Sequence, residues 1–224
     1  MGIGNFAIGY HGCDMDIAEL LLNDHRKFFV SDREHEWLGH GMYFWENNLR
    51  RGMEWANLKF ERQLIRKPAV IGALLNLRNC CDFSDQRYLN LIRSYHGNMK
   101  EDRAIRGRDM PVNFAPKGTL PKDIVARNLD CAAIEHMHEE MEWLSRFGTP
   151  DNFGCETKPF DSVRGLFIEG QPVFDGSGIY SKSHIQICIR NPECIVGFFK
   201  PRADGFDDLP GLEVRDDGVL LRAF

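Results

Sequence analysis

Two short segments combine bare backbone with side chains suited to a planar amide ligand. The first is Tyr10-His11-Gly12, where the glycine lets a ligand approach the main-chain N–H and C=O closely. A carboxamide needs one donor and one acceptor side by side, and a strand-end peptide offers both. The second is Gly39–Phe44, in which a turn with two glycines leads into Tyr43. An aromatic ring beside an open cleft stacks well on a flat heteroaromatic group, and best on a cationic one.

A third segment, His184–Ile189, has the alternating pattern of a strand. Alternation places its three isoleucines on one face and His184, Gln186 and Cys188 on the other. If the isoleucines face the core, His184 and Gln186 face a cleft or solvent. Glu169 lies at the end of the preceding predicted strand and could reach the same cleft.

Together these segments resemble the ADP-ribosyltransferase superfamily, on its diphtheria-toxin and poly(ADP-ribose)-polymerase side. Those enzymes carry a His-Gly pair, then a G-x-G-x-Y-F turn and strand, then a late strand that opens with a catalytic glutamate. Tyr10-His11-Gly12 resembles the first motif, and Gly39–Phe44 resembles the second. The run from Gln186 through Val196 is similar to the third, so the resemblance covers roughly residues 6–199.

The resemblance implies a fold and a set of roles. The fold would be α+β, with two packed, mostly antiparallel sheets split around an NAD cleft and flanked by helices. His11 would hydrogen-bond the adenosine ribose, Gly12 would hold the nicotinamide carboxamide, and Tyr43 would stack on the nicotinamide ring. Trp55, at an unusual spacing, is the candidate for the second aromatic of the family, and His184 could orient the ribose. NAD would serve as substrate, and no metal is implied.

The implied activity is mono-ADP-ribosyl transfer from NAD to a macromolecular acceptor, either protein or nucleic acid. The sequence departs from the family at Gln186, because glutamine can hydrogen-bond but carries no charge. Glu169 or His184 could compensate, or the enzyme could transfer single units slowly; chain elongation is not expected. Two alternatives stay open: an NAD glycohydrolase, and an inactive NAD or ADP-ribose binding module, which the glutamine favours. A structural role in a larger complex, through residues 96–122, is a weaker third.

The composition is that of an ordinary globular protein. The chain has 224 residues, 43% apolar and 27% charged, with a net charge of −5. Such a balance excludes a disordered or collagen-like chain and gives no basic field for nucleic acid or anionic membrane. The longest apolar run, Ala69–Leu75, is far too short to span a bilayer, so we expect no membrane association. The cysteine pattern favours a reducing compartment, so we expect a cytoplasmic location. Seven cysteines without a C-x-x-C pair argue against disulfides and zinc, although Cys13 near His11 leaves a thiol nucleophile conceivable.

The elements that would position these residues can be read from periodicity and capping. We expect one catalytic domain over residues 1–200 and an acidic tail of low or conditional order over 201–224. The tail has three basic and six acidic residues. Residues 96–122 are expected to be irregular, and His136 and His138 to lie on a solvated helix face. The expected strands are Phe6–Gly12, Ala69–Leu77, Val163–Ile168, His184–Ile189 and Cys194–Phe199. The expected helices run from Asp14 or Asp16 to Leu22, from Asn47 or Asn48 towards Pro68, from Asp85 to Tyr95, and from Asp123 to Phe147.

Overall fold

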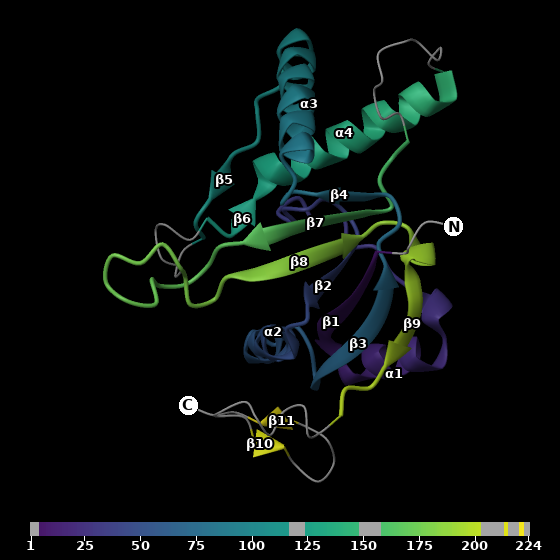
Figure 1. Ribbon diagram of the computed structural model, residues 1–224, viewed down its shortest axis with the longest axis vertical. Helices are drawn as coiled ribbons and strands as arrows, with labels where there is room; N and C mark the ends of the chain where they lie inside the picture. The colour runs from purple at the N-terminus through teal and green to yellow at the C-terminus, as the bar shows by residue number, and fades with distance from the viewer. Residues whose placement is uncertain (1–4, 117–123, 148–157, 203–212, 215–219, 222–224) are drawn as a thin grey trace. The chain divides into compact units, whose positions relative to one another are not determined.

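The computed structural model describes residues 5–116, 124–147 and 158–202, together with two short strands at 213–214 and 220–221. The chain is α+β, with mostly antiparallel strands and, in these residues, four α-helices. It divides into two compact units (Figure 1). Unit 1 comprises Met1–Phe29, Tyr43–Arg78 and Pro192–Phe224, and unit 2 comprises Val30–Met42 and Asn79–Asn191.

The strands of unit 1 pair in the order β2, β1, β3, β9, all antiparallel. They span Met42–Glu46, Phe6–Asp14, Pro68–Asn76 and Ile195–Phe199 respectively. β1 and β3 pair along their whole lengths, from Phe6 opposite Asn76 to Asp14 opposite Pro68. β1 and β2 pair only at Gly9 with Glu46 and at Tyr10 with Trp45. The strands expected at Phe6–Gly12 and Ala69–Leu77 are therefore confirmed.

Two capped helices complete unit 1. Asp14 caps α1 (Met15–Asn23) by accepting a hydrogen bond from the Asp16 N–H, and a 3₁₀ turn, η1 (His25–Lys27), follows. Asn48 caps α2 (Leu49–Glu61) by accepting from the Arg51 N–H. Both N-termini are confirmed. α2 ends at Glu61, earlier than expected, and Pro68 instead begins β3; another 3₁₀ turn, η2 (Pro192–Cys194), precedes β9.

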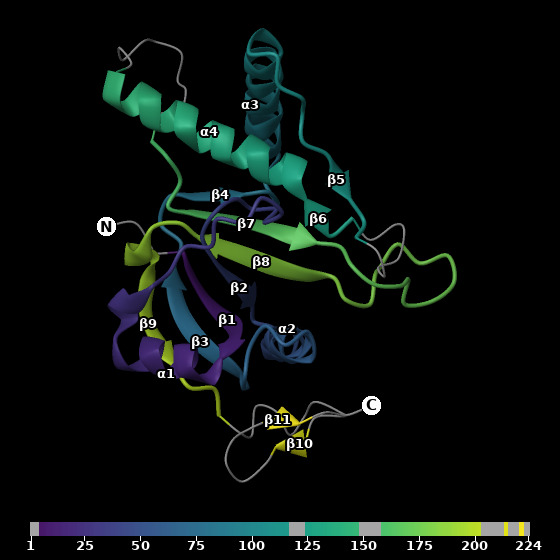
Figure 2. The same cartoon turned by 180° about the vertical axis from the view of Figure 1, so that it is seen from behind.

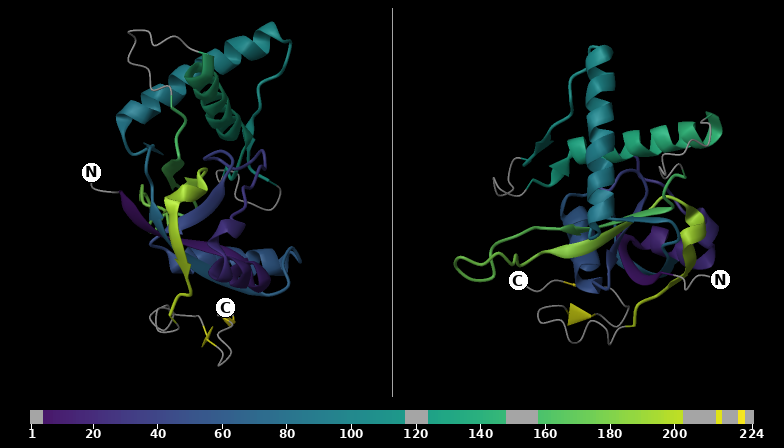
Figure 3. Two further views of the ribbon diagram at one scale, coloured as in Figure 1. Left: turned by 90° about the vertical axis from the view of Figure 1, so that its right-hand side faces the viewer. Right: turned by 45° about the horizontal axis from the view of Figure 1, so that its top comes forward.

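Unit 2 contains a second group of strands. β4 (Cys80–Asp82) pairs parallel with β7 (Ser162–Phe167), which pairs antiparallel with β8 (His184–Ile189). β5 (Asn113–Phe114) and β6 (Ala126–Arg127) form a separate small pair. The loop between β7 and β8 extends beyond the two strands (Figure 3). The strands expected near 163–168 and 184–189 are thus confirmed.

The two long helices of unit 2, α3 (Gln86–Ile105) and α4 (Asn128–Phe147), cross each other (Figure 2). The expectation that residues 96–122 are irregular is wrong at its start. α3 continues to Ile105 because Met99 extends the buried stripe of Tyr88 and Tyr95. α4 begins at Asn128; Asp123, the expected cap, and the rest of 117–123 lie outside the described residues.

The expected acidic tail is described only in part. Its strands β10 (Glu213–Val214) and β11 (Leu220–Leu221) form an antiparallel pair, and most of the remainder lies outside the described residues. The single domain expected over residues 1–200 stays a prediction. In the part of the chain that the structure describes, no helix combines the length and apolarity that crossing a membrane requires.

Candidate functional site

In unit 1 the first motif meets Tyr43, near the end of the second motif. The Nδ1 atom of His11 lies 2.7 Å from the carbonyl oxygen of Tyr43, across 32 positions of sequence. This contact lies just past the β1–β2 pair of Tyr10 with Trp45, so the imidazole links the two strands beyond that pair. A carbonyl oxygen can only accept, so Nδ1 must carry the proton, and Nε2 of the neutral ring is then an acceptor.

His11 is held in its neutral form. Burial and, to a smaller extent, the charge of Lys59 lower the pKa of the imidazole to about 4, although the bond to the Tyr43 carbonyl acts in the opposite direction. The ring packs between Phe29 and Phe44, with centroid distances of 5.7 and 5.8 Å. His11 therefore combines a fixed tautomer with an acceptor atom, which is what binding a ligand hydroxyl requires.

Gly12 and Tyr43 share one face of the unit 1 sheet. Tyr10 and Trp45 lie directly opposite each other, and opposed residues of an antiparallel pair point to the same side. Strand alternation then puts Gly12 on the side of Tyr10, and Tyr43 on the side of Trp45. Tyr43 is half-buried.

Helix α2 covers that face. A Cβ atom on Gly12 would lie 2.1 Å from the carbonyl oxygen of Gly52, so the helix backbone approaches as closely as a glycine permits. Trp55, further along α2, contacts Trp45 with ring centroids 6.1 Å apart and is itself 38% exposed. The structure thus brings Trp55 to the same face as Gly12 and Tyr43.

Lys59 is a component of this region that sequence reasoning missed. Its Nζ donates to the carbonyl oxygen of Gly12 at 2.6 Å and lies 6.0 Å from the centroid of the Trp55 ring. The available signal was its position four residues after Trp55, which places both side chains on one face of a helix. The backbone acceptor that was expected to receive a carboxamide N–H is therefore already bonded to an ammonium group.

In unit 2 the position of Gln186 is fixed by Trp37, which sequence reasoning also missed. The indole Nε1–H donates to Oε1 of Gln186 at 2.6 Å. Gly165 on β7 lies opposite Gln186, and a Cβ atom there would come within 2.7 Å of the Trp37 ring. The glycine makes room for the indole, and a glycine inside a strand was the available signal. Because the amide oxygen faces the indole, the amide NH₂ of Gln186 is directed elsewhere and offers donors.

The other two predicted residues of unit 2 differ in setting. His184 does not face solvent, because its ring is buried and stacked on Phe167 at 5.5 Å, with Nδ1 2.7 Å from the Lys182 carbonyl oxygen. Strand alternation alone does not account for Phe167 of β7, which lies directly opposite His184 of β8 and covers its ring. Glu169 lies two residues beyond β7, is half-buried, and accepts a backbone bond from the Lys182 N–H at 3.1 Å.

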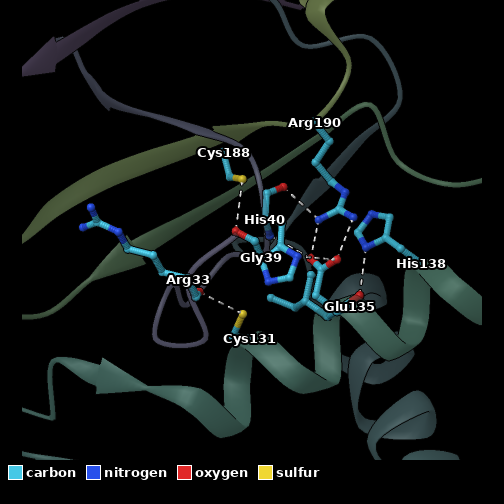
Figure 4. Close-up of polar contacts among 9 residues, drawn as sticks. Arg33, Gly39, His40, Cys131, Glu135, His138, Cys188 and Arg190 are labelled. Atoms are coloured by element: carbon cyan, nitrogen blue, oxygen red, sulfur yellow. Dashed lines mark hydrogen bonds and ion pairs between the residues drawn. The ribbon is translucent and has the colours of Figure 1, made fainter. Parts of the chain in front are cut away.

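A polar network in unit 2 holds the Gly39-His40 turn (Figure 4). Glu135 of α4 accepts from the His40 N–H at 2.7 Å and forms a two-pronged ion pair with Arg190. Arg190 also donates to the His40 carbonyl at 3.0 Å. Burial raises the pKa of the Glu135 carboxyl, but the bonds from Arg190 and His40 outweigh it and hold the pKa below its ordinary value. A Cβ atom on Gly39, at φ +81°, would lie 2.4 Å from Glu135.

The expected solvated helix face is wrong for His138. This side chain is only 5% exposed, packs against Phe160 at 5.9 Å, and bonds the Ile134 carbonyl through Nδ1 at 2.8 Å. Burial, with a smaller contribution from Arg190, lowers the pKa of this imidazole to about 4. Like His11, it is neutral at neutral pH.

The thiol hypothesis loses support, because burial raises the pKa of Cys13 to about 12 and the thiolate is the nucleophilic form. Unit 1 brings together His11, Gly12, Tyr43 and Trp55, whereas Gln186, His184 and Glu169 belong to unit 2.

Among the described residues no group of three or more His, Cys, Asp or Glu side chains has the arrangement of a metal site. Comparison with known proteins gives no match among family models, curated proteins or solved structures.

Proposed function

We propose that this chain binds NAD and transfers single ADP-ribose units to a macromolecular acceptor, a protein or a nucleic acid. The observation that carries the proposal is the hydrogen bond between His11 and the Tyr43 carbonyl. It joins two motifs that sequence resemblance alone assigned to one ligand. Gly12 and the Tyr43 side chain also lie on one face of the unit 1 sheet.

Each group in unit 1 has a proposed role. The ring of Tyr43 stacks on the nicotinamide, and Trp55, partly exposed on the same face, supplies a second aromatic surface. The backbone of Gly12 binds the substituent on the pyridine ring. Nε2 of His11 accepts a hydrogen bond from a ribose hydroxyl, a role that a neutral imidazole with a fixed tautomer supports.

The reaction breaks the bond between C1′ of the ribose and the pyridine nitrogen. The bonding electron pair leaves with nicotinamide, which becomes neutral, and C1′ acquires oxocarbenium character. A lone pair of the acceptor then forms the new bond to C1′, and the acceptor loses its proton to solvent. The protein contributes chiefly by holding the dinucleotide in a reactive orientation.

The resemblance alone assigns Gln186, a residue of unit 2, to a ribose contact. Because its oxygen is held by Trp37, it offers N–H donors to a hydroxyl oxygen and places no negative charge near the cation. A charge-assisted bond is about twice as strong as a neutral one, so we infer slow, single-unit transfer. Glu169, in the same unit, is the proposed source of compensating charge.

The hydrogen bond between Trp37 and Gln186 favours a second candidate function, an NAD or ADP-ribose binding module without turnover. An amide locked by an indole can recognise a ribose while supplying no catalytic anion. Calorimetric binding of NAD with no consumption of the dinucleotide would establish this function. Release of nicotinamide without labelled macromolecule would instead establish an NAD glycohydrolase.

The proposal is tested by incubating the protein and a cell lysate with NAD that is labelled in its adenosine. Nicotinamide release is measured, and the label is separated into protein, nucleic acid and small molecules. Tyr43→Ala and His11→Ala should each lower nicotinamide release by about tenfold, because each removes a positioning contact. Phe60→Ala is the control, an exposed aromatic at the end of α2. Equal turnover in all of these proteins would remove the site assignment.

A further inference from the structure

The imidazole of His11 packs on two phenylalanine rings that differ in exposure. Phe44 is fully buried, whereas Phe29 is 39% exposed. The ring centroids of Phe29 and His11 are 5.7 Å apart, and the two ring planes meet at 72°. In such an edge-to-face contact the imidazole covers at most one face of the phenyl ring. Phe29 is therefore the aromatic group beside His11 that still has ring surface to offer a ligand.

The atom of His11 that would meet a ligand is Nε2, because Nδ1 is bonded to the Tyr43 carbonyl. Nε2 of His138 is buried without a hydrogen-bond partner among the described residues, but Nε2 of His11 is not such an atom. No hydrogen bond to a described residue engages it, so the 9% exposure of His11 includes this nitrogen. An acceptor that reaches the surface beside a partly exposed ring suits a sugar that carries an aromatic base.

The backbone that presents Phe29 is anchored to helix α1. Phe29 follows the 3₁₀ turn η1 by two residues, and the Asp24 carboxylate caps this turn by accepting from the Arg26 N–H at 3.1 Å and from its Nε at 2.9 Å. The N–H of Asp24 in turn donates to the Leu20 carbonyl at 3.0 Å. A ring on an ordered segment loses less conformational freedom when a ligand stacks on it.

We propose that the ring of Phe29 stacks on the adenine of the dinucleotide and determines how tightly the adenosine half is bound. The inference rests on the proposed function, in which Nε2 of His11 accepts from a hydroxyl of the adenosine ribose. The adenine is attached to C1′, next to the carbon that bears the 2′-hydroxyl. A ribose held at His11 therefore brings the base near the ring that packs on His11. All of these groups belong to unit 1.

The test compares calorimetric titrations of the whole protein and of Phe29→Leu with NAD, ADP-ribose and nicotinamide mononucleotide. Leucine keeps an apolar side chain against His11 but removes the aromatic face. NAD and ADP-ribose should bind about tenfold more weakly to the variant. Nicotinamide mononucleotide lacks the adenosine, so its affinity should change less than twofold. An unchanged affinity for ADP-ribose, or an equal loss for all three ligands, would overturn the inference.

Two further variants separate stacking from packing. Phe29→Tyr retains the ring and should bind ADP-ribose within about twofold of the unmodified protein; a loss as large as in Phe29→Leu would contradict stacking. Phe6→Leu is the matched control, an exposed phenylalanine of β1 in the same unit, and should change none of the affinities. NAD binding that is insensitive to Phe29→Leu would remove this inference alone. Binding of neither NAD nor ADP-ribose to the unmodified protein would remove the proposed function as well.

Discussion

Each unit contains a histidine that is buried, binds a backbone carbonyl through Nδ1, and has its pKa lowered to about 4. The carbonyl that holds His138 belongs to Ile134, one turn earlier in the same helix. The carbonyl that holds His11 belongs to Tyr43, on another strand. His138 bonds a carbonyl oxygen of its own helix, whereas His11 joins two separate motifs.

The difference shows that burial and neutrality do not by themselves mark a functional histidine. His138 packs on Phe160, and its Nε2 is buried without a hydrogen-bond partner among the described residues, as in a side chain that fills a core. His11 lies beside a glycine that α2 approaches through Gly52 and Lys59. What distinguishes the two is the backbone that each imidazole organises.

The largest expected effect is the acid sensitivity that both histidines create. The pKa of each falls from 6.5 to about 4 on folding, so below pH 6.5 the unfolded chain takes up protons that the folded chain does not. The free energy of unfolding should therefore fall as the pH drops from 6.5 towards 4, by about 3 kcal/mol for each histidine. Urea unfolding at a series of pH values measures this loss. His11→Phe and His138→Phe should each flatten the profile; an unchanged slope in both variants would contradict the account.

The next effect concerns the polar network of unit 2, in which Glu135 holds the Gly39-His40 turn through Arg190. Glu135→Gln removes the charge from a pair whose side chains are both 19% exposed. We expect a loss of about 2 kcal/mol in the free energy of unfolding. The matched control is Glu142→Gln on the same helix, which breaks an exposed pair with Arg146 and should cost less than about 0.5 kcal/mol. Equal costs would mean that the network does not hold the turn.

A third prediction tests the charge that unit 2 lacks. In Gln186→Glu, one carboxylate oxygen keeps the bond from the Trp37 indole, and the second replaces an N–H donor with a negative acceptor. Nicotinamide release should rise about tenfold, because the developing cation at C1′ gains a counter-charge. Gln186→Ala should lower it. If the glutamate variant is no faster than the alanine variant, Gln186 does not contact the reacting ribose.

The smallest effect is expected at Trp37, which acts through Gln186. Trp37→Phe keeps an aromatic ring over Gly165 but removes the indole donor, so Gln186 loses its fixed orientation. Turnover should fall about threefold. In the double variant with Gln186→Ala, the Trp37 substitution should have no further effect. Independent losses would show a structural role for Trp37 instead.

Local signals predicted the elements well. Asp14 and Asn48 cap helices as their residue types indicate, and the apolar run of β3 lies between two strands. The sequence predicts that the α3 helix ends near Tyr95, because the glycines and basic residues around 97–108 are typical of a loop. Tyr95 and Met99 nevertheless carry the buried face onward, so tertiary packing outweighed local propensity.

The candidate site was predictable only where it depends on motifs. His11, Gly12 and Tyr43 could be selected only because their motifs occur together, in the order of the family that the sequence resembles. Lys59 and Trp37 could not, since each depends on a glycine in a distant segment that admits close packing. His184 was misplaced because strand alternation ignores what the neighbouring strand lays over a side chain, here Phe167.

The central claim is that the His11-Gly12 peptide and Tyr43 bind the pyridine of a dinucleotide. The most direct measurement is an NMR titration of the whole protein with NAD, with the backbone amide signals assigned. We predict that the Gly12 and Tyr43 amides shift most strongly, and that Tyr43→Ala weakens the apparent affinity by about tenfold. Binding that leaves the signals of both amides unmoved while other signals shift, or no binding of NAD, would contradict the account.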